Sequence, residues 1–329
     1  MTAGPALLIT NGDAAGSLLR KAFQGTEVLP WRDVLHDGPV PLTSSFSELS
    51  NIRVKFLASK GWGDPSNLQA MFDARDRGLA HQGEFARVGL WFEHDLYDQL
   101  QLLQLLDWFG DQRRDDGLSL VQADDFLGRQ SLESLIELQA LEAPVSDDQR
   151  ELAKRAWLAF RQPSPEEWAA LLSSKLDALP HLAAAIRRSL EELPHPGTGL
   201  SRTERAILEA MKEGVSTPLE LFTTVQQSEE AAFMGDWSFW DWLDGLANGE
   251  APLIEGLTGS PFRPDWSDDE RAAFLKSDVG LTEFGAQVLA GKKDHAARNE
   301  IDRWLGGTHL TNDALWRWDS GNDRLIGSD

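Results

Sequence analysis

The chain has 329 residues, of which 31 are lysine or arginine and 53 are aspartate or glutamate, so its formal net charge is −22. This charge opposes binding to nucleic acid and to anionic membranes, and no basic patch stands out that would reverse it. The absence of cysteine excludes disulfides, thiolate nucleophiles and cysteine-ligated metal centres. Because the chain also lacks a secretory leader pattern and a membrane-length apolar run, we expect a cytoplasmic protein with no membrane contact.

Strands alternate with helices through the first 145 residues. The patterns predict strands at residues 6–10, 26–31, 87–92 and 118–122, and helices at residues 16–23, 46–60, 66–80 and 97–109. Such alternation is typical of a mostly parallel sheet with right-handed crossovers. We therefore expect a Rossmann-like α/β domain over residues 1–145.

The pattern changes twice after this domain. Residues 146–197 are predicted to form a helical segment that ends in a linker rich in proline and glycine. Ser201 and Glu204 then form a capping box at the start of a helix, and two further short helices precede a predicted strand at residues 252–255. Three short helices followed by strands predict a winged-helix-like α+β domain over residues 198–329.

A glycine-containing turn follows the first strand and contains Asn11, Gly12, Asp13 and Gly16. Free backbone N–H groups at the start of a helix suit a phosphate or a carboxylate, so these four residues are predicted to bind a ligand. The alternative is an ordinary tight turn in which Asp13 favours the helix N-terminus.

An irregular loop follows the second strand and contains Arg32, Asp33, His36 and Asp37. Arg32 is suited to clamping an anion, and His36 with Asp33 or Asp37 would make an oriented acid–base pair. The alternative is a structural loop that is held by arginine–aspartate pairing.

The third predicted strand ends at a cluster that contains Glu93, His94, Asp95, Tyr97 and Asp98. If the first and third strands are neighbours, Asp13 and His94 lie at the same edge of the sheet. His94 and Asp95 are then catalytic candidates, and Glu93 and Tyr97 are ligand-binding candidates. Histidine with carboxylates also suits a divalent metal, which is a candidate cofactor although no metal-binding spacing such as HExxH is present. The alternative is a buried structural network of ionic groups.

The remaining histidines and the late tryptophans receive simpler interpretations. His295 and the histidines at 81, 181 and 195 stand in polar or linker surroundings and are expected to be solvated. Six of the late tryptophans stand among aspartates, so core packing explains them better than stacking on bases; they are Trp237, Trp240, Trp242, Trp304, Trp316 and Trp318.

The segments 11–13, 30–39 and 91–100 together resemble the signature of a bacterial family of unknown function, the domain-of-unknown-function family eighteen thirty-five. The segments 199–204, 252–254, 303–307 and 316–319 resemble the companion region that is usual in that family. The resemblance covers most of the chain and implies the same architecture, but it implies no activity and no catalytic residues.

Our leading hypothesis is that the N-terminal domain binds a small anionic or phosphate-bearing ligand at the carboxyl edge of its sheet, as a hydrolase or transferase. The alternative is a non-enzymatic regulatory protein that contacts a protein partner through residues 198–329. That region holds 12 lysines and arginines against 24 aspartates and glutamates, a balance of −12, which opposes DNA binding.

Overall fold

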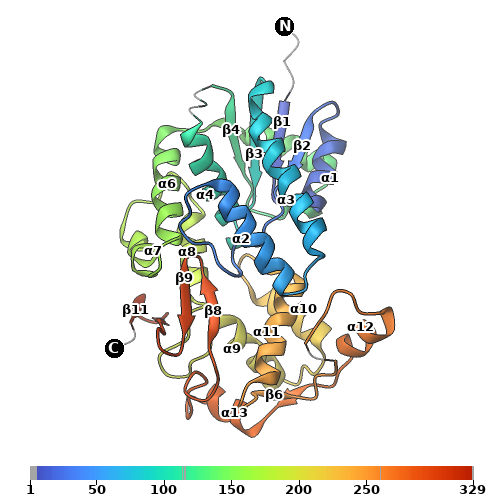
Figure 1. The fold of residues 1–329 in the computed structure, drawn as a ribbon, viewed down its shortest axis with the longest axis vertical. Coiled ribbons are helices and arrows are strands. Elements are labelled where there is room, and N and C mark those ends of the chain that lie inside the picture. Colours follow the sequence, from blue (N-terminus) through green and yellow to red (C-terminus); the bar gives the residue numbers. More distant parts are fainter. Residues whose placement is uncertain (1–5, 113, 115, 260, 328–329) are drawn as a thin grey trace.

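A computed structural model gives the fold and describes residues 6–112, 114, 116–259 and 261–327 (Figure 1). A five-stranded sheet in the order β2-β1-β3-β4-β5 forms the N-terminal unit; β1 to β4 are parallel and β5 is an antiparallel edge strand. Its elements are β1 (Ala6–Thr10), α1 (Asp13–Ala22), β2 (Glu27–Pro30), α2 (Phe46–Ser59), α3 (Pro65–Ala80), β3 (Arg87–Phe92), α4 (Leu96–Asp111), β4 (Leu118–Gln122), α5 (Leu132–Leu138) and β5 (Ala143–Pro144). The predicted mostly parallel α/β sheet is confirmed.

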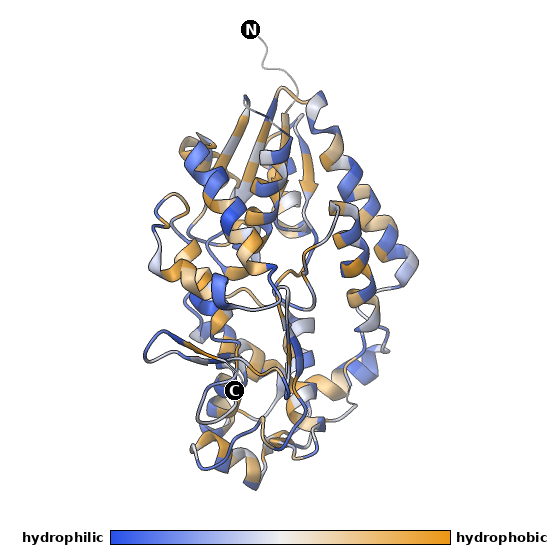
Figure 2. Cartoon of the chain, turned by 60° about the vertical axis from the view of Figure 1, so that its left-hand side comes forward, coloured by the Kyte–Doolittle hydropathy of each residue, from blue (hydrophilic) through white to orange (hydrophobic). Residues whose placement is uncertain are grey.

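Apolar side chains alternate between the two faces of the sheet. In β1, Leu7 and Ile9 belong to the core on one face, whereas Leu8 packs with α1 and α5 on the other. Figure 2 shows hydrophobic residues recurring along the strands, and hydrophobic and hydrophilic residues alternating along the surrounding helices. Because both faces are covered, the sheet is doubly wound. The chain leaves β1 toward β2 on one side and β3 toward β4 on the other, so the topological switch point lies between β1 and β3.

The helix α1 begins three residues earlier than the sequence predicts. Gly12 is its extended N-cap, and the first helical residue is Asp13, whose carboxylate is favoured at the positive end of the helix. Gly16 therefore lies inside the helix, and its N–H donates to the Gly12 carbonyl at 2.9 Å. The N–H group of Gly16 is thus bonded within the helix and is not free for a ligand.

A helical segment joins the sheet to the C-terminal unit, as predicted. It contains α6 (Asp147–Phe160), α7 (Glu166–Ala170) and α8 (Leu182–Leu190). The helix α6 begins at a capping box between Ser146 and Gln149, and both α6 and α8 pack on α4. Their apolar residues continue the core that begins at Leu7 in β1 and reaches Trp318 in the C-terminal unit.

The C-terminal unit starts with three helices and a short antiparallel strand pair, as in a winged helix. These are α9 (Arg202–Lys212), α10 (Pro218–Ser228), α11 (Asp236–Asn248), β6 (Ile254–Glu255) and β7 (Gly280–Leu281), with α12 (Asp268–Leu275) inserted between the two strands. The chain ends with α13 (Glu283–Leu289), β8 (Asp302–Leu305), β9 (Thr308–Thr311), β10 (Arg317–Asp319) and β11 (Arg324–Ile326). The β8–β9 hairpin extends toward the N-terminal unit (Figure 1).

The tip of this hairpin attaches the C-terminal unit to the rest of the molecule. The Gly306 carbonyl accepts from the Val40 N–H at 2.7 Å, and the Gly307 N–H donates to the Phe160 carbonyl at 3.0 Å. Gly306 has a φ of 58°, and a Cβ there would lie 2.0 Å from the Phe160 carbonyl oxygen. Only glycine fits this approach. In the described part of the chain, no helix is long and apolar enough to cross a membrane.

Candidate functional site

Hydrogen bonds close the switch point between the ends of β1 and β3. The Asn11 side-chain amide donates to Glu93 and to Asp98, at 2.9 Å in each case. The Tyr97 hydroxyl donates to the Asn11 carbonyl at 3.1 Å. This crevice is the usual ligand position in open α/β sheets. Here side chains of the protein bond to one another across it, which favours the structural interpretation of Asn11 and Glu93, whereas Tyr97 also lines the second of the cavities described below.

Three carboxyl groups lie buried beside Asn11. Glu93, Asp95 and Asp98 each offer an oxygen within 4.8 Å of the others, and each is at most 3% exposed. Burial raises the pKa of Asp95 to about 8, and burial likewise raises the pKa values of Glu93 and Asp98. At neutral pH the Asp95 carboxyl group therefore keeps its proton.

Backbone N–H groups bond to one oxygen of each carboxyl group in this cluster. Glu93 accepts from the Leu127 N–H at 2.7 Å, Asp98 accepts from the Glu93 N–H at 2.7 Å, and Asp95 caps α4. The number and type of ligands suit a divalent metal, but an ion would have to displace these bonds and the proton on Asp95. The divalent metal stays a prediction.

Asp13 and Arg32 engage each other at the N-terminus of α1. The Arg32 guanidinium donates to both carboxylate oxygens of Asp13, at 2.7 and 2.5 Å. This bond lowers the pKa of Asp13 and raises that of Arg32. A phosphate at this helix end would have to separate the pair.

A buried arginine stabilises the loop that follows β2. Arg53 of α2 donates to the Asp33 carboxylate at 2.9 Å and to the carbonyls of Val34, Asp37 and Pro39. Neither the Arg53 side chain nor that of Asp33 is exposed, and a second arginine, Arg75, lies 3.5 Å from Asp33. Asp33 is thus part of a structural arginine–aspartate network, which was the predicted alternative for this loop. The same network fixes the backbone on either side of His36.

His36 is buried without a hydrogen-bond partner among the described residues. Its side chain is 4% exposed, and Nε2 lies 3.5 Å from Asp37 Oδ2, beyond good hydrogen-bond distance. The rings of Tyr97 and Phe233 meet it edge-on, with centroids at 5.8 and 5.0 Å. Burial lowers the His36 pKa, although Asp37 opposes the shift, so the imidazole is neutral at pH 7. A neutral imidazole is competent to accept a proton.

His94 lies apart from this position. Its ring is 6.1 Å from that of Phe126 and 5.9 Å from that of His181. His36 lines the two cavities described next, whereas His94 lines neither. The geometry thus separates the two predicted catalytic histidines.

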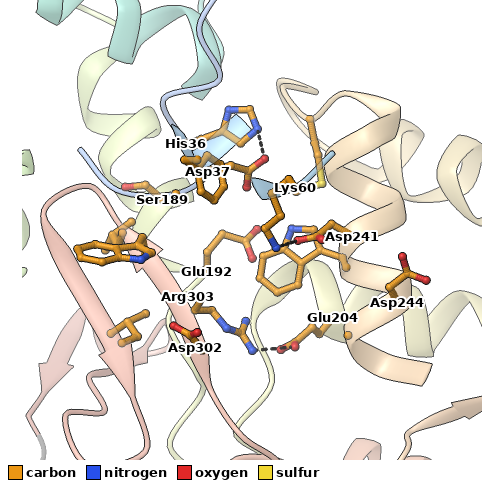
Figure 3. A pocket seen from close by; sticks show the side chains of 18 of the residues that line it. His36, Asp37, Lys60, Ser189, Glu192, Glu204, Asp241, Asp244, Asp302 and Arg303 are labelled. Atoms are coloured by element: carbon orange, nitrogen blue, oxygen red, sulfur yellow. Dashed lines mark hydrogen bonds and ion pairs between the residues drawn. The ribbon is translucent and has the colours of Figure 1, made fainter. Parts of the chain in front are cut away.

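Two adjoining cavities lie between the N-terminal and C-terminal units. The first, which we call the inter-unit cavity, has a volume of about 300 Å³ and reaches from His36 to Arg303 of β8 (Figure 3). The second, of about 830 Å³, lies over the loops at the carboxyl edge of the sheet and is bounded by α10 and α11. His36, Phe233 and Met234 line both cavities.

Four side chains that line the inter-unit cavity have buried polar atoms without hydrogen-bond partners in the described structure. These atoms are both ring nitrogens of His36, Asp37 Oδ2, Glu192 Oε2 and Arg303 Nη1. We call these side chains the unpartnered set. Leaving a buried polar group unpaired costs about 1–3 kcal/mol, so native proteins keep few of them. Four such side chains, contributed by three segments of the chain, line one cavity, and this indicates a binding site for a polar molecule.

Their other atoms hold the set in position. The second oxygen of Glu192 accepts from Arg188 at 2.6 Å and from Thr203. Arg303 donates through Nη2 to Glu204 at 2.9 Å, and its guanidinium lies 4.7 Å from the centre of the Trp242 ring. Glu192 and Arg303 thus each use one polar atom for the fold and keep another without a partner among the described residues.

The sequence assigned no role to Glu192 or Arg303, because they lie in the helical linker and in the C-terminal hairpin. The expectation that His295 is solvated is wrong: its side chain is 5% exposed and lies against Glu204, with 3.7 Å between Nε2 and Oε1. Burial lowers the His295 pKa. The interpretation of the tryptophans as core residues holds for Trp240 and Trp318, which are buried, whereas Trp242 lines the inter-unit cavity.

No protein-family model matches the chain, and no curated protein matches it. The resemblance to a family of unknown function therefore stays a prediction.

Proposed function

We propose that the protein binds a small polar molecule in the inter-unit cavity and acts on it as a hydrolase or group transferase. The observation that carries this proposal is the unpartnered set, which offers hydrogen-bonding atoms to a molecule of limited size. The loop with His36 follows β2 at the carboxyl edge of the sheet, where open α/β folds bind ligands.

His36 is the acid–base residue of the proposed reaction. Its neutral imidazole would take a proton from a water molecule or a substrate hydroxyl, and Asp37 would stabilise the imidazolium that forms. The free Nη1 of Arg303 would bind an anionic group or a developing negative charge. His94 and Asp95 have no place in this reaction because they lie outside the cavity.

An anionic group on the ligand is best supported at Arg303. The predicted anion clamp Arg32 is already paired with Asp13, whereas Arg303 keeps a buried N–H group free of partners in the described structure. We therefore propose that Arg303 of β8, and not Arg32, binds an anionic group of the ligand.

A thermal-shift screen of nucleotides, sugar phosphates, amino acids, sugars and divalent metals tests the proposal. Compounds that raise the melting temperature of the wild type should fail to raise that of His36→Phe and Arg303→Met. Asp13→Asn is the control and should respond like the wild type, because Asp13 lies outside the cavity. If no compound shifts the wild type, or if all four proteins respond alike, the proposal is wrong.

A protein partner for residues 198–329 is the second candidate function. Leu219 of α10 and Trp237 of α11 are 52% and 37% exposed, and a bound protein would cover these apolar side chains. Capture of partners from a lysate of the source cell, compared between the wild type and the double variant Leu219→Glu, Trp237→Glu, tests this role. A cytoplasmic location likewise stays a proposal, supported by the absence of cysteine.

A further inference from the structure

We infer that the ligand of the inter-unit cavity is a small organic amine that also carries an oxygen acceptor. Its ammonium group would lie against Asp37 and Glu192, and its acceptor would meet Arg303. The inference rests on the proposed function, because it names the class of molecule that this cavity takes.

The charge of the lining favours a cation. Seven carboxylic side chains line the cavity, namely Asp37, Glu192, Glu204, Asp241, Asp244, Glu300 and Asp302, against the two permanent cations Lys60 and Arg303, a formal balance of −5. Lys60 is paired with Asp241 at 2.6 Å and Arg303 with Glu204 at 2.9 Å, and Arg188, which lies outside the lining, is paired with Glu192 at 2.6 Å, so three of the seven have a cationic partner. A multiply charged anion such as a phosphate would meet a negative field here.

The hydrogen-bonding capacity of the unpartnered set matches an ammonium group. An ammonium has three N–H donors and no acceptor. Asp37 Oδ2 and Glu192 Oε2 are acceptors, and an ammonium that bonds to them leaves the acceptor nitrogen of a neutral His36 for the proton that it takes in the proposed reaction. An amine at this end would therefore give N–H donors to two buried acceptors.

The other end of the cavity offers a hydrogen-bond donor instead of acceptors. Arg303 Nη1 is a donor only, and it needs an oxygen atom of the ligand. Figure 3 shows His36, Asp37, Glu192 and Arg303 following one another down the cavity. The ligand thus carries its amine toward His36 and its hydroxyl or carboxylate toward Arg303.

The aromatic lining and the volume of the cavity restrict the class of ligand further. Phe56, Phe160, Phe233, Trp242 and Trp304 line the cavity. Aromatic rings combined with carboxylates are a usual environment for organic cations. A volume of about 300 Å³ is at the lower end of small-molecule sites and admits an amino sugar or an amino acid rather than a polymer.

Pairs of compounds with and without an amino group measure the contribution of the amine to binding. Binding of glucosamine is compared with that of glucose, and binding of 4-aminobutanoate with that of butanoate, by calorimetry or ligand-observed NMR. We expect at least one amine to bind the wild type ten or more times more tightly than its match without the amine.

Glu192→Gln tests the placement of the amine. Glutamine keeps the oxygen that accepts from Arg188 and Thr203, but it replaces the unpartnered oxygen by an NH₂ group that repels an ammonium. Affinity for the amine should fall ten-fold or more in this variant and in Asp37→Asn. Glu137→Gln removes an exposed carboxylate on α5 and should leave affinity unchanged, and thermal melting checks that each variant is folded.

The outcomes distinguish this inference from the function on which it rests. If uncharged or phosphorylated compounds bind as tightly as amines, and His36→Phe abolishes their binding, the amine class is wrong and the proposed function stands. If no compound binds, or if His36→Phe leaves all binding intact, both are wrong. If an amine binds but Glu192→Gln and Asp37→Asn bind it as well as the wild type, the inference is wrong.

Discussion

Replacing His36 by phenylalanine should stabilise the free protein while abolishing ligand binding. Phenylalanine keeps a ring between Tyr97 and Phe233, whose centroids lie 5.8 and 5.0 Å from that of His36, and it removes two buried nitrogens that lack hydrogen-bond partners in the described structure. The 3.5 Å contact with Asp37 partly compensates one nitrogen, so we count one unpaired group. The expected gain in the free energy of unfolding at pH 7 is then about 1–3 kcal/mol.

The pH dependence of this gain provides a second test. Burial lowers the His36 pKa below its usual 6.5, so below that pH the unfolded chain binds a proton that the folded chain does not. The stability of the wild type therefore falls as the pH drops below 6.5, by up to about 1.4 kcal/mol per pH unit from this group. The phenylalanine variant lacks this loss, and its advantage should grow between pH 7 and pH 5.

Urea unfolding of both proteins at pH 5, 6 and 7 measures these differences. A variant that is less stable than the wild type by more than about 1 kcal/mol at pH 7 would show that the imidazole is needed for folding, against the reasoning from unpaired groups. An advantage that shrinks at pH 5 would contradict the lowered pKa. Improved stability with lost binding is the trade-off expected at a functional site.

Three further changes test the surroundings of the site. Arg53→Ala leaves the buried Asp33 carboxylate, among the described residues, with only its 3.5 Å contact to Arg75, and it should lower the free energy of unfolding in urea by about 3–5 kcal/mol; a loss under about 1 kcal/mol would show that the loop does not depend on this network. Asp95→Asn keeps an acceptor for the α4 cap but cannot ionise. Because the pKa of Asp95 is raised to about 8, this group makes the free energy of unfolding of the wild type decline as the pH rises from 4 to 8, and the free energy of unfolding of the variant should decline less. Equal urea midpoints of the two proteins at both pH values would refute this. Gly306→Ala forces a Cβ to within 2.0 Å of a carbonyl oxygen at a φ of 58°, so its melting temperature should fall by several degrees, and an unchanged melting temperature would mean that the hairpin tip is not held there.

Local patterns in the sequence account for the sheet and its carboxyl edge. The apolar run that ends at Phe92, followed at once by a helical pattern, predicts β3 and α4 because side-chain burial repeats at fixed spacing along each element. The sequence predicts the start of α1 three residues too late, because an N-cap glycine has no side chain to mark it.

The inter-unit cavity leaves no comparable pattern. Glu192 and Arg303 are separated from His36 by more than 150 residues of chain, and no periodicity connects them. The sequence does not distinguish the roles of Asp33 and Asp37. In the structure Arg53 pairs with the Asp33 carboxylate, whereas Asp37 lines the cavity. Such roles follow from tertiary packing, which one sequence does not encode as a local signal.

A crystal structure of the protein soaked with small amines, sugars and amino acids tests the central claim most directly. We predict a bound molecule in the inter-unit cavity, with polar atoms within hydrogen-bond distance of His36, Glu192 and Arg303. Compounds that bind only elsewhere, while the same atoms of His36, Glu192 and Arg303 remain without a ligand, would contradict the claim that this cavity is the functional site.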